Sequence, residues 1–253
     1  MTTPPVVDAA WLHDHLAEVV VLDASIERTA DGFGSGFDAY AEAHLPGARF
    51  ADLFTAFSDP HAAYPFTMPP VAHLTEAARA AGVHDGTPVV VYDRNGGAWA
   101  ARVWWLLRVH GFDAVSVLDG GLGAWTGPLE SGPPTPAAPG ELTLRAPGPV
   151  TADLADVEAG ENQLVCALRR SSFENEHIPG STNLPYPELL RPDGTLDLGL
   201  VRSRAAALGL SESAIVYCGG GINAAGLVLA LEAAGLPAPR LYDGSLNEWR
   251  ERG

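Results

Sequence analysis

The sequence contains no lysine, and all 15 of its basic residues are arginine. A chain without lysine has no amine for a Schiff base or for pyridoxal phosphate, and it has no P-loop lysine to hold a nucleotide phosphate. Acidic residues number 31, which leaves a formal net charge of −16. Because such a surface repels phosphate backbones and anionic lipid headgroups, we expect neither nucleic acid nor a membrane as a partner.

Cysteine is also scarce, since Cys166 and Cys218 are the only two in the chain. Two cysteines do not make a disulfide framework, and 253 residues are enough to bury a hydrophobic core without one. With no histidine pair beside them they do not suggest zinc, so we expect no metal and no cofactor. The stretch MTTPPVVDAAWLHDHL lacks the basic start and apolar core of a signal peptide, and no apolar run reaches the roughly 18 residues of a membrane span. We therefore predict a reducing, cytoplasmic location.

What the chain does have is an internal repeat. VVVYDRNGGAWAA around Asp93 returns as AIVYCGGGINAA around Cys218, and VLDGGLGAW returns as LYDGSLNEW. HLPG at residues 44–47 and HIPG at residues 177–180 give another match in the same order. Matches that keep their order indicate a duplicated domain. The spacing between them shrinks along the chain, which predicts shorter loops in the second copy.

Residues 127–149 separate the two copies and contain seven prolines. That composition, without a periodic apolar pattern, predicts an extended linker between a domain at 1–126 and a domain at 150–253. In both copies apolar runs bounded by turn residues alternate with helical patterns. The predicted strands include residues 19–23, 88–93, 114–119 and 214–218, and the predicted helices include residues 98–110 and 223–234. This alternation predicts an α/β fold in which each domain is a mainly parallel sheet with helices on both faces.

The most informative loop begins at Cys218, which follows a predicted buried strand and precedes three glycines. We expect the next helix to begin at an Asn223 N-cap. Glycines let the backbone curl so that its N–H groups surround one centre, and the helix N-terminus adds partial positive charge. Such a setting favours a thiolate over a thiol. A buried cysteine is also an ordinary core residue, but a purely structural loop does not need so much bare backbone.

The loop YCGGGINA resembles the active-site loop of rhodaneses and 3-mercaptopyruvate sulfurtransferases. The segments EHIPGSTNL, VVVYDRNGGAWAARVWWLLRVHGFDAVSVLDGG and YDGSLNEW are similar to other signatures of that family, so the resemblance extends over almost the whole chain. It implies two tandem rhodanese-like domains joined by the Pro-rich linker at 127–149. The domain at 1–126 would be non-catalytic, with Asp93 in place of the cysteine, and the domain at 150–253 would be catalytic.

The resemblance also implies a function for Cys218. A sulfurtransferase of this family takes sulfane sulfur from thiosulfate or 3-mercaptopyruvate as a cysteine persulfide and passes it to a thiophilic acceptor, cyanide or a thiol. The loop residues implied in substrate binding are Gly219, Gly220, Gly221, Ile222 and Asn223. A low-turnover sulfur carrier or regulatory binding module is the alternative. A cysteine phosphatase is disfavoured, because Ala224 stands six residues after the cysteine, where those enzymes need an arginine.

The chain departs from the family at several positions. Leu168 stands where tandem members often have a substrate-binding arginine, and Arg169 and Arg170 are the neighbouring candidates to replace it, with solvated surface charge as the equal alternative. The segment before Met68, where mercaptopyruvate enzymes tend to carry a histidine, reads YPFT, so both donors stay open. Cys166 stands where the family usually has an aspartate, and we predict a buried structural thiol rather than a resolving cysteine.

Two further pairs of residues occur at matching places in the two copies. His44 and His177 are duplicated in the domain that lacks the cysteine, so we predict structural hydrogen bonds for them rather than catalysis. Asp119 and Asp243, each followed by glycine, are predicted to be turn residues.

Overall fold

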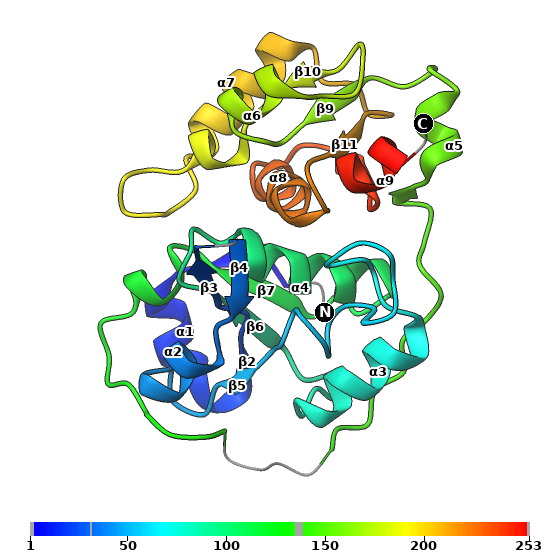
Figure 1. Ribbon diagram of the computed structural model, residues 1–253. Helices are drawn as coiled ribbons and strands as arrows, with labels where there is room; N and C mark the ends of the chain where they lie inside the picture. The colour runs from blue at the N-terminus through cyan, green and yellow to red at the C-terminus, as the bar shows by residue number, and fades with distance from the viewer. Residues whose placement is uncertain (1–2, 31, 135–138, 252–253) are drawn as a thin grey trace.

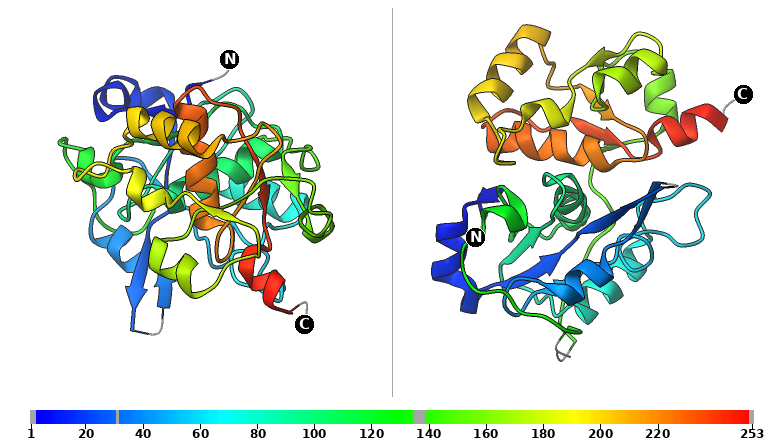
Figure 2. Two further views of the ribbon diagram at one scale, coloured as in Figure 1. Left: turned by 90° about the horizontal axis from the view of Figure 1, so that it is seen from above. Right: turned by 60° about the vertical axis from the view of Figure 1, so that its left-hand side comes forward.

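The computed structural model describes residues 3–30, 32–134 and 139–251 (Figure 1). The outer ends of the two predicted domains, at residues 1–2 and 252–253, and residues 135–138 of the predicted linker lie outside the described residues. Two halves are stacked on one another, and the two ends of the chain lie in different halves (Figures 1 and 2). None of the helices in the described ranges has the length and hydrophobicity that crossing a lipid bilayer requires.

The first half is built on a five-stranded sheet in the order β1-β7-β6-β2-β5, and every pair of neighbours is parallel. Its strands are β1 (Val6–Val7), β2 (Val20–Asp23), β5 (Arg49–Phe50), β6 (Val89–Tyr92) and β7 (Val115–Leu118). Its helices are α1 (Ala9–His15), α2 (Phe37–Glu42), α3 (Val71–Ala80) and α4 (Ala98–Val109), with short 3₁₀ turns at Leu16–Glu18 and Gly121–Ala124.

The second half repeats this plan with a parallel five-stranded sheet in the order β8-β12-β11-β9-β10. Its strands are β8 (Thr151–Ala152), β9 (Leu164–Cys166), β10 (Thr182–Asn183), β11 (Ile215–Tyr217) and β12 (Arg240–Tyr242). Its helices are α5 (Leu154–Glu158), α6 (Arg170–Asn175), α7 (Leu198–Leu208), α8 (Ile222–Ala233) and α9 (Ser245–Glu251), with a 3₁₀ turn at Tyr186–Leu189. Corresponding strands occupy corresponding places, which confirms the predicted duplication and the α/β fold.

Each sheet is apolar on both faces because its strands alternate between two cores. In β6, Val89 and Val91 belong to one buried cluster, whereas Val90 and Tyr92 belong to another on the opposite face. Helices cover both clusters, so the central strands are mostly apolar, as the sequence pattern predicted, although polar residues such as Ser116 of β7 are buried among them.

The two halves meet through α4 and α8, the helices that follow the two equivalent loops (Figure 2). Residues of both helices belong to one continuous hydrophobic cluster, and Trp104 and Trp105 of α4 are buried in it, as predicted. Because each helix begins just after its loop, packing helix against helix brings both loops to the boundary between the halves.

The described parts of the linker, residues 127–134 and 139–149, run along the first half. The backbone of Glu130 exchanges hydrogen bonds of 2.9 Å with that of His44, and the Gly140 N–H donates to the Arg79 carbonyl at 2.8 Å. Leu142 and Leu144 are buried in the core. We propose the division 1–126, 127–149 and 150–253, with a linker that is anchored to the first half before it crosses to the second.

An antiparallel hairpin made of β3 (Ile26–Thr29) and β4 (Gly32–Ser35) belongs to the first half. The described part of the second half contains no such hairpin between its equivalent elements, β9 and α6. The missing hairpin makes the connection from β9 to α6 shorter than that from β2 to α2, in agreement with the shorter loops predicted for the second copy. The hairpin projects towards the boundary between the halves (Figure 1), where the cysteine loop also lies.

Candidate active site

Cys218 directly follows β11 and lines a cavity of about 810 Å³ between the two halves. The thiol residue itself is only 2% exposed. The first half supplies the β3–β4 hairpin, the segment around Phe66 and the loop after β6 to the cavity lining, and the second half supplies the loops after β9 and β11 and part of α9. A reacting molecule can therefore contact both halves at once.

The loop after Cys218 turns into its helix earlier than predicted. The N-cap of α8 is Gly221, at φ 82°, and Asn223 is already inside the first turn. The predicted Asn223 N-cap is therefore wrong, because a glycine in the left-handed region redirects the chain before Asn223 is reached. A Cβ at Gly221 would lie 2.7 Å from Nη1 of Arg102, so the close approach of this arginine also requires glycine here.

The equivalent loop of the first half also enters its helix through a left-handed glycine N-cap, Gly97, and it shows what such a loop can bind. The buried Asp93 carboxylate accepts hydrogen bonds from the amides of Asn95, Gly97, Trp99 and Ala100, at 2.7 to 3.0 Å. Burial raises the pKa of Asp93, and these four hydrogen bonds act in the opposite direction. The loop is thus an anion nest, and a side chain of the loop itself fills it.

In the second half the same nest contains no carboxylate. By the repeat, the amides that correspond to the four donors belong to Gly220, Gly221, Asn223 and Ala224. Within the described ranges none of these four N–H groups donates to another protein group. Four unused donors at a helix N-terminus beside a cysteine provide a place for negative charge on sulfur.

Ser245 supports the cysteine from behind, and sequence reasoning missed it. Its hydroxyl accepts the Cys218 N–H at 3.1 Å and donates to the Tyr242 carbonyl at 2.9 Å. Ser245 is fully buried at φ 51°, a conformation that the first half gives to the equivalent Gly121, at φ 58°. A non-glycine residue in this region often marks a functional site. The repeat itself contained the signal, because it aligns a serine with a glycine.

A buried ion pair joins the halves behind the loop. Nη2 of Arg102, on α4 of the first half, lies 2.6 Å from Oδ1 of Asp243, which follows β12 of the second half. The Arg102 side chain is fully buried, and Nη2 also donates to the Phe66 carbonyl at 2.6 Å. Asp243 in turn accepts the Met68 N–H at 2.7 Å. The cysteine loop of one half is therefore supported by a charged residue of the other.

The aspartates predicted to be turn residues thus have a larger role. Besides Asp243, Asp119 of the first half accepts the Leu196 N–H of the second half at 2.9 Å. Both aspartates lie where turns were predicted, Asp119 in a turn and Asp243 in a bend, and in addition both side chains reach across the boundary. His44 and His177 do follow the structural prediction, since each ring nitrogen bonds a backbone carbonyl four residues earlier, at 2.8 and 2.9 Å.

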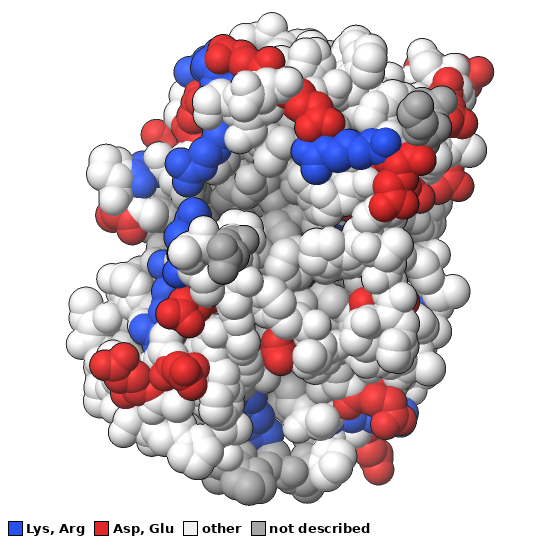
Figure 3. All heavy atoms as spheres, viewed as in Figure 1, with Lys and Arg blue, Asp and Glu red and all other residues white. Residues whose placement is uncertain are grey.

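Of the two predicted substrate arginines, the structure brings one to the cavity. Arg169 is part of the lining, whereas Arg170 lies outside it and pairs with Glu188 at 3.3 Å. The prediction for Arg170 is corrected on this ground: the chain turns into α6 at Arg169, so the next side chain points elsewhere. Arg28 and Arg191, which no sequence signal singled out, also line the cavity. Figure 3 shows basic side chains gathered along one side of the hollow between the halves.

Cys166 is close to Cys218 in the fold but faces away from it. In the sheet Cys166 is paired with Tyr217, and both belong to the cluster on the face opposite to that of Cys218. Burial raises the pKa of Cys166 to about 11, so its thiol stays protonated at neutral pH. These features match a structural thiol. Within the described ranges no group of three or more His, Cys, Asp or Glu residues is placed to hold a metal ion.

Duplicated α/β domains that meet at one cysteine-bearing loop define a tandem-domain protein with a single candidate nucleophile. The rhodanese-like domain family matches this chain twice, at residues 8–128 and 151–252. The chain therefore belongs to the rhodanese family, as the resemblance implied.

The similarity to known sulfurtransferases extends over nearly the whole length of the chain. It is 31% identical to the 3-mercaptopyruvate sulfurtransferase of Escherichia coli strain K12, over 100% of this chain and 97% of that protein. It is also 31% identical to the thiosulfate sulfurtransferase of Gallus gallus, over 97% of this chain and 93% of that protein. The crystal structure of SseA from Escherichia coli superposes with a TM-score of 0.84 at 29% identity, covering 96% of this chain and 99% of that one. The protein is a sulfurtransferase.

Proposed function

We propose that this protein moves sulfane sulfur from thiosulfate or 3-mercaptopyruvate to cyanide or a thiol, through a persulfide on Cys218. The observation that carries the proposal is the nest after Cys218, whose copy in the first half holds the Asp93 carboxylate with four amides. The same backbone arrangement around a cysteine stabilises a thiolate and, after reaction, the terminal sulfur of a persulfide. Gly219, Gly220, Gly221, Ile222 and Asn223 are the loop residues proposed to surround that sulfur.

The charge around the cavity supports an anionic donor. Arg28, Arg169 and Arg191 line it, and its described lining contains no aspartate or glutamate. This is the reverse of the whole chain, whose formal charge is −16. A locally positive hollow on an acidic protein concentrates small anions near the cysteine. These arginines are proposed to bind the donor in place of the family arginine that Leu168 replaces.

The chemistry takes place in two displacements. The Cys218 thiolate attacks the outer sulfur of thiosulfate or the thiol sulfur of 3-mercaptopyruvate, and a new S–S bond forms on Cys218. With thiosulfate the S–S bond of the donor breaks and sulfite leaves with the electron pair. With 3-mercaptopyruvate the C–S bond breaks, and the carbon leaves as an enolate that takes up the proton lost by the thiol, directly or through water, to become pyruvate. Cyanide or a thiol then attacks the terminal sulfur of the persulfide, and Cys218 leaves as a thiolate. Charge is held by the loop amides in both steps, so no metal is needed. Free, buried cysteines fit a reducing compartment, and we propose the cytoplasm.

Mass spectrometry of the intact chain and of its Cys218 peptide tests this proposal. After incubation with thiosulfate or with 3-mercaptopyruvate, we expect a gain of one sulfur atom on Cys218, removed again by cyanide or by a thiol. A comparison of the two donors at equal concentration identifies the preferred one. An adduct that no acceptor removes at a useful rate would indicate a sulfur carrier instead. Absence of an adduct with either donor would leave a regulatory binding module.

A further inference from the structure

We propose that Phe33, Phe66 and Trp99 form an acceptor subsite, which we call the aromatic wall, for an organic thiol that carries an aromatic ring and a carboxylate. All three residues line the cavity that contains Cys218, and all three come from the first half. The inference rests on the proposed function, because the thiol would take its sulfur from the Cys218 persulfide.

The rings of the aromatic wall are arranged to receive a planar group. Phe33 and Phe66 each meet Trp99 edge to face, with ring centroids 5.1 Å apart and interplanar angles of 69° and 72°. Aromatic rings prefer offset or edge-to-face partners, so a ligand ring can join such a group without disturbing it. Phe33 is 46% exposed, so part of its ring is open to contact with a ligand in the cavity.

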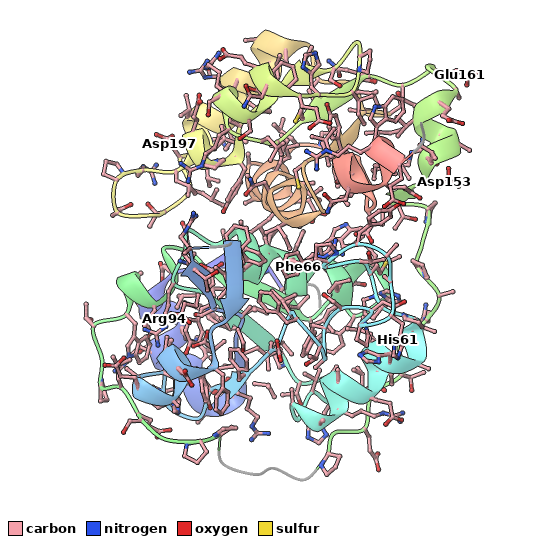
Figure 4. All side chains as sticks on the ribbon, viewed as in Figure 1. His61, Phe66, Arg94, Asp153, Glu161 and Asp197 are labelled. Carbon is pink, nitrogen blue, oxygen red and sulfur yellow. The ribbon has the colours of Figure 1, made fainter. Side chains whose placement is uncertain are left out.

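Phe66 is held in place by a strained backbone. Its φ is 63°, a left-handed value that side-chain-bearing residues rarely adopt. The hydrogen bond from Arg102 to its carbonyl, and that from the Met68 amide to Asp243, secure Phe66 and the residues that follow it. Figure 4 shows Phe66 at the boundary between the halves. Strain of this kind persists where surrounding contacts over-determine it, and it fixes the aromatic wall before a ligand arrives.

The size of the cavity points to a ligand larger than either donor. Cavities of about 300–1,000 Å³ accommodate drug-sized organic molecules, and this one measures about 810 Å³. Thiosulfate and 3-mercaptopyruvate are far smaller, so neither would reach from the sulfur of Cys218 to fill the space along the aromatic wall. An acceptor with a ring attached near its thiol would use that space.

The charge beside the wall selects an anionic ring compound. Arg28 stands opposite Phe33 in the β3–β4 hairpin, with its guanidinium carbon 5.6 Å from the centre of that ring. Arg191 lines the same cavity from the second half. A carboxylate on the acceptor would therefore find a guanidinium next to the site of its ring.

The transfer step needs no external oxidant or reductant. The acceptor thiolate attacks the terminal sulfur of the Cys218 persulfide, and a new S–S bond forms on the acceptor. The bond between that sulfur and Cys218 breaks, and Cys218 takes its electron pair to become a thiolate again. The product is the acceptor's own persulfide, and total charge is unchanged.

A pair of thiols that differ only in one ring tests the subsite. The protein is first loaded with the better donor, freed of excess donor and checked by mass for the added sulfur. It is then mixed with 3-mercaptopropionate or with 2-benzyl-3-mercaptopropionate, which share the same thiol and carboxylate. We expect the benzyl compound to remove the sulfur at least about tenfold faster at low thiol concentration, because its ring is buried on binding.

Matched phenylalanine variants locate the effect. Phe33→Ala should remove most of the preference for the benzyl compound, measured as the ratio of the rates with the two thiols in the same variant. Phe37→Ala is the control, since Phe37 is 40% exposed on α2 and lies outside the cavity lining. As a measurement on the unaltered protein, 3-phenylpropionate, which has no thiol, should compete with the acceptor.

Equal rates with the two thiols, or a preference that Phe33→Ala leaves intact, would overturn the subsite. So would a failure of 3-phenylpropionate to compete with the acceptor. Failure to load sulfur at all is a different result, seen before any acceptor is added, and it would contradict the proposed function.

Discussion

The loop after β6 in the first half and the equivalent loop after β11 in the second half differ in which group occupies the nest of backbone amides. In the first half Asp93 fills it with a carboxylate bonded by four amides. In the second half Cys218 stands at the entrance, and the corresponding amides have no protein partner within the described ranges. The comparison teaches that one backbone design yields a structural element when its anion is built in and a candidate reaction site when the anion must be supplied.

The supports of the two loops differ as well. Gly121 follows β7 in a left-handed conformation, and Ser245 does so after β12, where its hydroxyl accepts the Cys218 N–H. The loop from Asp93 to α4 is also one residue longer than that from Cys218 to α8. The second copy thus has a tighter loop and an extra side-chain hydrogen bond, which restrict the position of the sulfur.

The largest expected effect comes from removing the thiol. Cys218→Ser places a hydroxyl, a far poorer nucleophile at neutral pH, at the entrance of the nest, so we expect sulfur transfer to fall by about a thousandfold or more. Steady-state assays with both donors measure this loss, and a thermal unfolding curve close to that of the parent protein serves as the control. Transfer that persists in Cys218→Ser would show that sulfur is carried elsewhere.

The next effect comes from reshaping the nest. Gly221→Ala forces a side chain into the left-handed region and towards Arg102, so we expect about a hundredfold loss of transfer. Gly219→Ala is the matched variant, because its Cβ would meet nothing within 4 Å and its φ is not positive. Its loss should be much smaller in the same rate assay. Similar losses in the two variants would contradict the assigned geometry.

A third comparison concerns the ion pair that links the halves. Arg102→Met leaves Asp243 partly buried without its charged partner, so we expect the free energy of unfolding to drop by about 3–5 kcal/mol. Arg108→Met is the control on the same helix, since the more exposed Arg108 pairs with Asp113 and Glu232 at 3.4 and 3.2 Å and should contribute about 1 kcal/mol or less. Urea denaturation measures both. Equal losses would mean that burial of the pair is unimportant.

A fourth comparison removes the Asp93 carboxylate, which fills the nest of the first half, by a point substitution. Asp93→Ala leaves four amides of the first loop without their acceptor, and we expect about 2–3 kcal/mol of lost stability. Because the cysteine is in the other half, sulfur transfer per folded molecule should change little. Denaturation combined with an activity assay at low temperature checks both expectations. A large loss of transfer in folded Asp93→Ala would indicate that the first loop also acts in the reaction.

The smallest effect is expected at Cys166. Cys166→Ser should retain most of the transfer activity, because this thiol faces the other side of the sheet. Burial raises the pKa of Cys166 to about 11, so thiolate forms in the folded protein only as the pH approaches that value. At pH 8 iodoacetamide should therefore modify Cys218 and spare Cys166, and both should react after unfolding. Peptide mapping by mass spectrometry distinguishes the two sites.

Much of the fold could be predicted because its signals are local. The strand preceding Cys218, the two equivalent helices and the duplicated order of elements all follow from apolar runs, glycines and repeated motifs. The N-cap after Cys218 was misplaced by two residues, since Gly221 and Asn223 are both acceptable N-caps by residue type. The choice between them depends on the space beside Arg102, which the sequence does not reveal.

The roles of the residues around the sulfur of Cys218 also depend on contacts that the sequence does not reveal. Ser245 differs from its repeat partner Gly121, so a signal existed, but its meaning depends on the hydrogen bond to Cys218. Arg28 and Arg191 carried no signal, because arginine on a hairpin or in a loop is usually solvated surface charge. Both reach the cavity only because the halves stack with their loops inward.

The sequence by itself determined that the chain is a duplicated α/β protein with one cysteine at the head of a glycine-rich loop, because strand patterns, helix ends and repeats are written in neighbouring residues. Only the tertiary structure decided which side chains of the first half, the one without the cysteine, line the cavity beside Cys218. Contacts such as Arg102 with Asp243 join positions far apart in the chain, and they arise from the packing of α4 on α8 rather than from any local preference.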